Sequence, residues 1–353
     1  MHSFDAKALK TFYERLQDEE SRRIFSARLM YFLDGNEEHL WKMIDDIWQK
    51  GIFVPEVGEL IAQQKSGKEI VLYGAGTLGA AAKTFFERHG LKVSLFCDKN
   101  AAKQQSGFMG VPVISLSDLI NNHSTYVVVL TASQVYANEI KRELAANGNT
   151  AKVFDFFVHY EFQGYFEHDF LKPVANEIYL DCGVLNGSDI RAFMGFSGQN
   201  HTKIYGFEPD AGSYKRALEN LHGIPGVELI NKGVWSSAAT LSFSQQSDGV
   251  SHISDGGLAK ITVTTIDETV GTENVTFIKM DVEGAELEAL KGATQTLTRC
   301  KPRLAISIYH KPEDILEVSL YIHALVPDYK YYLRHHEVGT SGIVLFALPE
   351  CAR

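Results

Sequence analysis

The stretch that decides the fold is Glu177-Ile-Tyr-Leu-Asp-Cys-Gly-Val-Leu-Asn-Gly-Ser-Asp189. Ile178 to Leu180 is a short apolar run, which is typical of a buried strand. The glycines that follow permit a tight turn and bring backbone N–H groups close to a ligand. Apolar residues at helical spacing come next. The sequence therefore predicts a strand, a turn and a helix, with Ser188 as the helix N-cap.

Acidic residues stand at the ends of the predicted strands. Asp181 ends the first strand, and a second strand from Lys203 to Phe207 runs into Glu208 and Pro209. An acid at the tip of the second strand is where a Rossmann-type fold holds ribose hydroxyls. The helix after Gly187 adds positive potential at its N-terminus. No Walker lysine follows, so the turn favours a ligand with an amine or other donors over a phosphate cradle.

Five segments of the second half form a recognisable set: Asp181-Cys-Gly183, Gly206-Phe-Glu-Pro209, Thr265-Ile-Asp-Glu268, Ile278-Lys-Met-Asp-Val-Glu-Gly284 and the strand from Arg303 that ends in His310. Together they resemble the FkbM-type S-adenosylmethionine-dependent methyltransferases. The resemblance covers roughly residues 170 to 348. It implies a class I methyltransferase sheet that ends in an antiparallel hairpin. It also implies S-adenosylmethionine as cofactor and a small-molecule or glycan substrate.

The resemblance implies a set of cofactor-binding residues. Asp181 would accept hydrogen bonds from the amino end of the cofactor, directly or through water, and Gly183 would let the backbone approach its methionine part. Glu208 would accept both ribose hydroxyls; the alternative for Glu208 is a solvated strand end. Adenine contacts are expected from the turn that begins at Asn231. The predicted set is Asp181, Gly183, Gly187, Glu208, Pro209 and Asn231.

The predicted catalytic residues are Asp281, His310 and Glu283. Asp281 and Glu283 follow a buried strand, and residues two apart in an extended segment point the same way. His310 ends the adjacent strand. The group could be a general base for a hydroxyl proton, a divalent metal site, or a cap for the next helix. We predict a catalytic or substrate-binding role for Asp281 and His310, leave Glu283 open, and assign no metal, because such spacing is common without an ion.

A second Rossmann-like pattern lies in the first half of the chain. Lys68 to Tyr73 predicts a strand that enters Gly74-Ala-Gly-Thr-Leu-Gly79, and Asp98 lies 22 residues after Gly76, as the ribose acid of a dinucleotide site does. With Gly110-Val-Pro-Val-Ile-Ser115, this half resembles the small domains attached to sugar-modifying enzymes, in which ligand binding varies. Gly74, Gly76, Gly79 and Asp98 form a possible nucleotide site. The alternative is a βαβ unit that has no ligand.

Length and patterning predict the domain organisation. At 353 residues and 45% apolar content, two domains are expected. We predict a helical extension over residues 1–66, a Rossmann-like domain over 67–160 and a methyltransferase domain over 170–353, which makes an α/β protein with two Rossmann-like domains. Ser244 to Gly257, rich in Ser, Gly, Gln and Asp, predicts a loop that is either a mobile lid or an inert surface segment.

Charge and cysteine usage exclude several classes of protein. The net charge of −10 argues against nucleic acid as a partner, because phosphate binding needs clustered Lys and Arg. No apolar run approaches ~18 residues, so no membrane span is expected. The N-terminus lacks the pattern of a signal peptide, and the four cysteines are scattered, which together favour the cytoplasm. The oligomeric state stays open.

The sequence as a whole predicts an S-adenosylmethionine-dependent methyltransferase that modifies a hydroxyl of a sugar, glycan or secondary metabolite. The alternatives use the N-terminal domain: an NAD-dependent oxidoreductase, or a non-catalytic nucleotide-sugar-binding protein. The C-terminal half is favoured because it has an acid at every expected strand tip. The N-terminal half has a glycine turn and Asp98.

Overall fold

A computed structural model describes residues 6–48, 54–132, 134–155, 164–245, 251–253, 259–336 and 339–350. The chain divides into two compact units. The first comprises Met1–Leu40, Gln163–Glu337 and Ser341–Arg353, and the second comprises Trp41–Phe162 and Val338–Thr340. Residues 1–40 thus belong to the first unit, whereas the sequence assigned them to a separate extension. Where independently folding domains begin and end stays a prediction.

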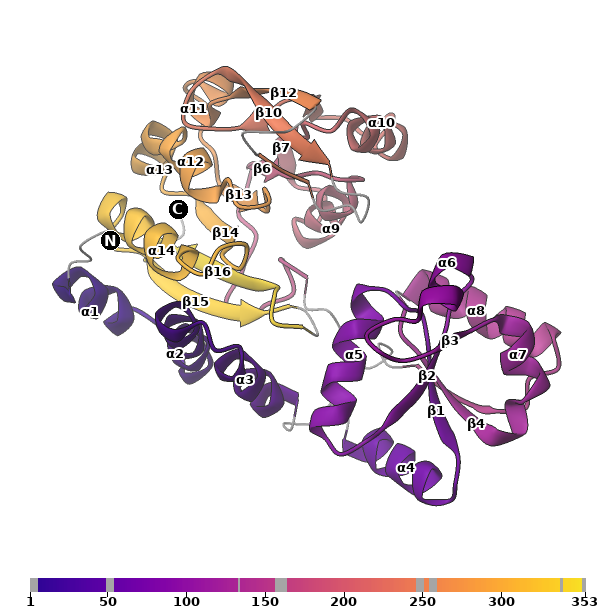
Figure 1. Cartoon of the computed structure of the whole chain (residues 1–353). Coiled ribbons are helices and arrows are strands. Elements are labelled where there is room, and N and C mark those ends of the chain that lie inside the picture. The colour runs from indigo at the N-terminus through magenta and orange to yellow at the C-terminus, as the bar shows by residue number, and fades with distance from the viewer. Residues whose placement is uncertain are drawn as a thin grey trace. The chain divides into compact units, whose positions relative to one another are not determined.

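The first unit is built on a seven-stranded mixed sheet (Figure 1). Its order is β15-β16-β14-β13-β6-β7-β8. Strands β14, β13, β6, β7 and β8 pair in parallel, and β16 pairs antiparallel with both neighbours. The bounds are β6 Glu177–Cys182, β7 His201–Phe207, β8 Val227–Ile230, β13 Phe277–Met280, β14 Arg303–Ser307, β15 Lys330–His335 and β16 Ile343–Leu348. The predicted α/β class and closing hairpin are confirmed.

Aromatic side chains pack helix α9 against this sheet. The rings of Tyr179 on β6 and Phe193 on α9 stack with centroids 4.0 Å apart, and Phe277 on β13 packs against both. The helices of this unit that follow β6 in the chain are α9 Ser188–Phe196, α10 Ala211–Asn220, α11 Ile266–Val270, α12 Glu286–Lys291, α13 Thr294–Cys300 and α14 Asp314–Leu325. The predicted Ser188 N-cap is wrong: Gly187 is the N-cap, at φ +87°, because the tight turn needs a left-handed residue there.

A smaller sheet follows in the chain, with the order β11-β10-β12-β9. Its strands are β9 Gly233–Val234, β10 Ala239–Gln245, β11 Ser251–Ile253 and β12 Ala259–Thr264. The loop predicted from Ser244 to Gly257 is therefore wrong for β11, which pairs antiparallel with β10. The ladder to β10 stabilises a strand that composition does not favour. Residues 246–250 and 254–258 of that segment lie outside the described residues.

The first two helices of the chain pack on the edge of the seven-stranded sheet (Figure 1). They are α1 Ala6–Glu14 and α2 Glu19–Asp34. The ring of Phe12 lies 4.6 Å from that of Tyr331 on β15, and the backbone N–H of Leu333 donates to Ser21 Oγ over 2.9 Å. Phe12 is fully buried, so α1 contributes to the core of the first unit.

Arg28 of α2 is buried and supports the segment after β14. Its guanidinium donates to the backbone carbonyls of Ile308 and Lys311 over 3.4 and 3.2 Å. These two carbonyls flank the residue at which β14 was predicted to end, His310. Helix α2 thus supports the backbone that carries a predicted catalytic side chain.

The second unit contains a five-stranded parallel sheet of order β3-β2-β1-β4-β5 (Figure 1). Its strands are β1 Glu69–Tyr73, β2 Val93–Cys97, β3 Val113–Ile114, β4 Tyr126–Leu130 and β5 Lys152–Asp155. The remaining helices are α3 Glu38–Trp48, α4 Val54–Lys65, α5 Thr77–Arg88, α6 Ala101–Ser106, α7 Leu116–Asn121, η1 His123–Thr125 and α8 Gln134–Ala146. The second Rossmann-like sheet is confirmed. Among the residues described, no helix is both long and apolar enough to cross a membrane.

Two buried histidines contact each other in the first unit. The Nε2 atoms of His168 and His336 lie 3.0 Å apart, and the two residues are 6% and 9% exposed. Burial, together with the nearby Arg334, lowers the pKa of His168 to about 4 and that of His336 to about 3. One Nε2 can donate and the other accept as long as at least one of the two rings is neutral, and two protonated rings would repel each other.

We expect this pair to make the first unit sensitive to acid. The unfolded histidines bind protons below about pH 6.5, whereas the folded ones do so only near the lowered values, so stability falls as pH drops through this window. Urea denaturation at about pH 4.5 against about pH 7 should show a loss on the order of 2 kcal/mol per histidine. His168→Gln should lose less unfolding free energy on acidification than wild type does, and the exposed control His222→Gln should lose as much as wild type. A loss in His168→Gln equal to that of wild type would contradict the role given to the histidine pair.

Candidate functional site

A cavity of about 280 Å³ opens at the carboxyl ends of β6, β7 and β13 in the first unit. Ligands bind at this end of the strands in open α/β sheets. Of the residues predicted for the site, Gly183, Glu208, Pro209, Asp281 and Glu283 line the cavity. The other predicted residues of this half, which are Asp181, Gly187, Asn231 and His310, are not among its lining residues. The structure therefore brings residues of both the predicted cofactor-binding set and the predicted catalytic set to one cavity, although some members of each set do not line it.

Glu208 is held in a fixed orientation at the tip of β7. Its Oε2 accepts the N–H of Leu185 over 2.8 Å and its Oε1 accepts the N–H of Asp210 over 2.9 Å. Burial raises the pKa of this carboxyl, and the two backbone hydrogen bonds oppose that rise. Each carboxylate oxygen still has an acceptor site that a hydroxyl can use. Asn231 donates to the carbonyl of Glu208 over 2.8 Å, so it shapes the strand end.

Asp181 is fully buried and faces a lysine that the sequence analysis missed. Lys279 on β13 lies opposite Asp181 in the parallel register, and its Nζ is 3.1 Å from Asp181 Oδ1. Burial alone would lower the pKa of Lys279, but the carboxylates beside it raise it well above its ordinary value. Burial raises the pKa of Asp181 to about 7 against the opposing effect of this ammonium. Lys279 lines the cavity and Asp181 does not, so Lys279 lies between Asp181 and the cavity.

Asp189 completes the surroundings of this ammonium and was also missed. Its Oδ2 lies 3.0 Å from Lys279 Nζ, and both residues line the cavity. Asp189 belongs to the stretch from 177 to 189, and Lys279 belongs to the strand before Asp281. The missing signal was the strand register, because only the pairing of β13 with β6 shows that Lys279 lies beside Asp181.

Two glycines are required by close backbone approaches. A Cβ on Gly183, at φ +99°, would lie 2.0 Å from the carbonyl oxygen of Asp281. A Cβ on Gly187 would lie 2.8 Å from the side chain of Leu221. Gly183 thus lets the tips of β6 and β13 meet, and Gly187 lets the turn pack under α10. No side chain fits at either position without displacing a neighbour.

Asp281 is surrounded by hydroxyl groups. Tyr165 donates to Asp281 Oδ2 over 3.0 Å, and Tyr309 donates to Asp281 Oδ1 over 3.3 Å. The hydroxyl of Tyr165 also lies 3.3 Å from Ser307 Oγ at the end of β14. These contacts fix the carboxylate at the edge of the cavity. Glu283, two residues on, adopts φ +54°, a strained conformation of the kind that collects at functional sites.

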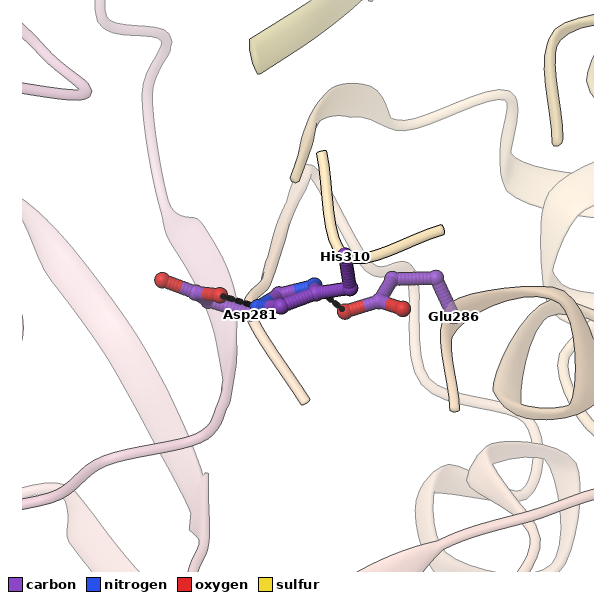
Figure 2. A group of neighbouring side chains, drawn as sticks. All are labelled: Asp281, Glu286 and His310. Carbon is purple, nitrogen blue, oxygen red and sulfur yellow. Dashed lines mark ion pairs between the residues drawn. The ribbon is translucent and has the colours of Figure 1, made fainter. Parts of the chain in front are cut away.

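His310 lies behind Asp281, between carboxylates. Figure 2 shows Asp281 and Glu286 on either side of its ring. Nε2 lies 3.4 Å from an oxygen of Asp281 and 3.4 Å from one of Glu283, and Nδ1 lies 2.9 Å from Glu286 Oε1. Burial would lower the pKa of His310, but these three carboxylates outweigh it and raise the pKa to about 10. Glu286, fully buried in the first turn of α12, was missed because its role depends on the fold.

In the glycine turn of the second unit, a backbone N–H donates to the side chain of Asp98. Asp98 Oδ2 accepts the N–H of Ala75 over 2.9 Å and lies 3.6 Å from Lys103 Nζ. Gly74 adopts φ +122°, and a Cβ on Gly79 would lie 2.0 Å from the carbonyl oxygen of Gly74. Gly76 is the N-cap of α5. The four residues of the predicted nucleotide site come together here, and their role stays a prediction.

The buried pair of Lys279 and Asp181 predicts a stability effect. Lys279→Met leaves the fully buried Asp181 without its cation, so urea denaturation should show a loss of about 3–5 kcal/mol. Adding Asp181→Asn to Lys279→Met should recover part of that loss. Lys291→Met removes a surface pair with Glu288 and should cost less than about 1 kcal/mol. Equal stability of Lys279→Met and wild type would show that the pair contributes little.

Comparison with known proteins gives matches that include the part of the chain that forms the cavity. Residues 181–333 match the model of the methyltransferase FkbM domain. The hexuronic acid methyltransferase AglP of Haloferax volcanii is 34% identical over 101 residues, a match that spans 27% of this chain and 42% of the length of that protein. A crystal structure of the methyltransferase FkbM from Methylobacillus flagellatus KT aligns with a TM-score of 0.49 at 20% identity, over 88% of this chain and 98% of that one.

The matched residues begin at Asp181 on β6 and end at Leu333 on β15, so they contain the cavity and all of its predicted residues. The resemblance drawn from the five sequence segments is confirmed. Residues 181–333 thus match the methyltransferase FkbM domain, which supports S-adenosylmethionine as the cofactor.

Proposed function

We propose that this protein transfers a methyl group from S-adenosylmethionine to a hydroxyl oxygen of a sugar, glycan or secondary metabolite. The observation that carries the proposal is a single cavity lined by both Glu208 and Asp281. The first offers acceptors for ribose hydroxyls, and the second offers a polar group for the acceptor. The similarity to a hexuronic acid methyltransferase favours a sugar. Incubation with S-adenosylmethionine and a uronic-acid glycan, followed by mass spectrometry, tests the acceptor class.

The cofactor would lie across the tips of β6, β7 and β13. Glu208 would accept the ribose hydroxyls, and the nearby Pro209, Gly233 and Val234 would contact the base. Lys279 and Asp189 offer a cation and an anion at the other side of Gly183. These opposite charges suit the carboxylate and ammonium of the methionine part. Asp181 would act through Lys279, because it is fully buried behind that side chain.

The chemical step is a direct displacement at the methyl carbon. An oxygen lone pair of the acceptor forms the new C–O bond while the C–S bond breaks. The electron pair of the broken C–S bond stays on sulfur, which becomes the neutral thioether of S-adenosylhomocysteine. The acceptor proton must leave as the bond forms. The cofactor supplies the reactivity, and the protein supplies position and exclusion of water.

The acceptor hydroxyl would be activated by the group around Asp281. Of the two residues predicted to act as a pair, Asp281 lines the cavity and His310 lies behind it. His310 is therefore proposed to act through Asp281, and Glu283 to face the acceptor from the strained turn. A cytoplasmic location and the absence of a nucleic-acid partner stay predictions.

The alternative functions rest on the second unit. A nicotinamide-dependent oxidoreductase or a nucleotide-sugar-binding protein would use Gly74, Gly76, Gly79 and Asp98. In the structure, Asp98 accepts an N–H of the turn itself, which gives these alternatives no added support. Reduction of NAD by the full chain with a sugar substrate would favour the oxidoreductase.

Glu208→Ala should weaken cofactor binding. It removes a carboxylate that is proposed to accept two hydroxyls, and the loss of one such charge-assisted group costs about 1.5–3 kcal/mol, or roughly tenfold or more in affinity. Calorimetry with S-adenosylhomocysteine measures the change. Glu219→Ala, on the exposed face of α10, is the matched control and should bind like wild type. Unchanged binding in folded Glu208→Ala would remove the ribose assignment.

Asp281→Asn and His310→Ala should each lower turnover strongly and leave cofactor affinity near that of wild type. Activation of the acceptor hydroxyl is worth roughly 10²–10⁴-fold, and neither residue is proposed to contact the cofactor's ribose. Turnover with a true acceptor and calorimetry with S-adenosylhomocysteine separate the two effects, with exposed His222→Ala as control. If both variants lose only cofactor affinity, the pair belongs to the cofactor site.

A further inference from the structure

Three side chains beside the cavity offer one ligand atom each within a small sphere. Asp281, Glu286 and His310 each place a carboxylate oxygen or ring nitrogen within 4.8 Å of the others. They come from the tip of β13, the first turn of α12 and the segment after β14. Asp281 lines the cavity, so the group is reached from it. One imidazole and two carboxylates form a ligand set that suits a divalent ion such as Mn²⁺, Mg²⁺ or Zn²⁺.

Polar atoms of this group lack hydrogen bonds although they are buried. The side chain of His310 is 10% exposed, and neither of its ring nitrogens has a hydrogen-bond partner among the described residues. Nδ1 is close to Glu286, but its direction is not that of a hydrogen bond. Glu286 is fully buried, and its Oε2 likewise lacks a hydrogen-bond partner in the described part of the chain. Buried polar atoms rarely lack a hydrogen-bond partner unless an ion or a water molecule is bound to them.

The spacing of these atoms fits an ion better than a hydrogen bond. An ion bonded at about 2.1 Å separates adjacent ligand atoms by about 3 Å at right angles and opposite ones by about 4 Å. The observed separations are 3.4 Å from His310 Nε2 to Asp281 Oδ1 and 2.9 Å from His310 Nδ1 to Glu286 Oε1, so they involve different nitrogens of the ring. The first is too long for a good N–H···O hydrogen bond. An ion would use one of the two nitrogens, and rotation of the side chains would bring that nitrogen and the two carboxylates, whose ligand atoms lie within 4.8 Å of one another, onto the ion.

The surroundings supply negative charge and supporting contacts. Glu283 adds a third carboxylate 3.4 Å from the ring. The neighbouring cations, Lys311 and Arg28, donate to backbone carbonyls. Tyr165 and Tyr309 hold Asp281, and the N–H of Val282 holds Glu286 Oε1 over 3.0 Å. Such contacts orient ligands in metal sites.

We infer that Asp281, Glu286 and His310 bind one divalent cation beside the methyl-transfer cavity, in place of the metal-free pair that the sequence suggested. The ion binding itself needs no assumption about activity; its catalytic role rests on the proposed function. An acceptor hydroxyl oxygen would occupy an open position on the ion, which makes its proton more acidic. As the C–O bond forms and the C–S bond breaks, that proton passes to Glu283 and then to solvent.

Direct ion binding tests the site. The full chain is treated with EDTA, dialysed, and titrated with Mn²⁺ by calorimetry and by electron paramagnetic resonance. One Mn²⁺ should bind per chain, and Glu286→Gln and His310→Gln should each weaken binding by more than about tenfold. Glu288→Gln is the matched control: it lies on the same helix, pairs with Lys291 and Ser236, and should bind Mn²⁺ like wild type.

Two further measurements make the outcome decisive. Circular dichroism shows whether each variant is folded, and Asp281→Asn provides a third ligand variant if Glu286→Gln is not. Titrations with S-adenosylhomocysteine on the same samples test the cofactor site separately, so loss of one binding event is distinguishable from loss of the other. The inference is overturned if Mn²⁺, Mg²⁺ and Zn²⁺ all fail to bind, or bind equally to wild type and every folded ligand variant.

Discussion

The structure of the site depends on the ion pair between Lys279 and Asp181, which joins β13 to β6 in the middle of the sheet. Both side chains are buried, and the pair lies at the level where these parallel strands end. A buried charge of this kind is tolerated only with a partner close by. Once the register is fixed, Gly183 meets the backbone of Asp281 and the strand tips enclose one cavity.

The polar group on the acceptor side is held from several directions. Asp281 comes from β13 and Glu286 from α12, while His310 follows β14, whose end is supported by Arg28 of α2. An N-terminal helix therefore contributes to the geometry of a site about 280 residues later in the chain. This explains why α1 and α2 belong to the methyltransferase unit: without them, the edge strand β15 would expose Tyr331 and the backbone after β14 would lose its support.

Much of this arrangement could be predicted from the sequence. The acids at the strand tips, the glycine turns and the closing hairpin are local patterns, and the structure shows the two Rossmann-like sheets that they indicated. Lys279 and Glu286 could not be found in this way, because strand register and the packing of α12 bring them to the site. The strand β11 was missed because its pairing with β10 outweighs its loop-like composition. The roles of the individual site residues remain predictions.

A crystal structure of the full chain with bound S-adenosylhomocysteine tests the central claim most directly. The account predicts the ligand in the cavity at the ends of β6, β7 and β13, with its ribose hydroxyls on Glu208 and its methionine end beside Lys279 and Asp189. The sulfur atom would then face Asp281. Density for the ligand at the Gly74 to Gly79 turn of the second unit, with the cavity of the first unit empty, would contradict the account.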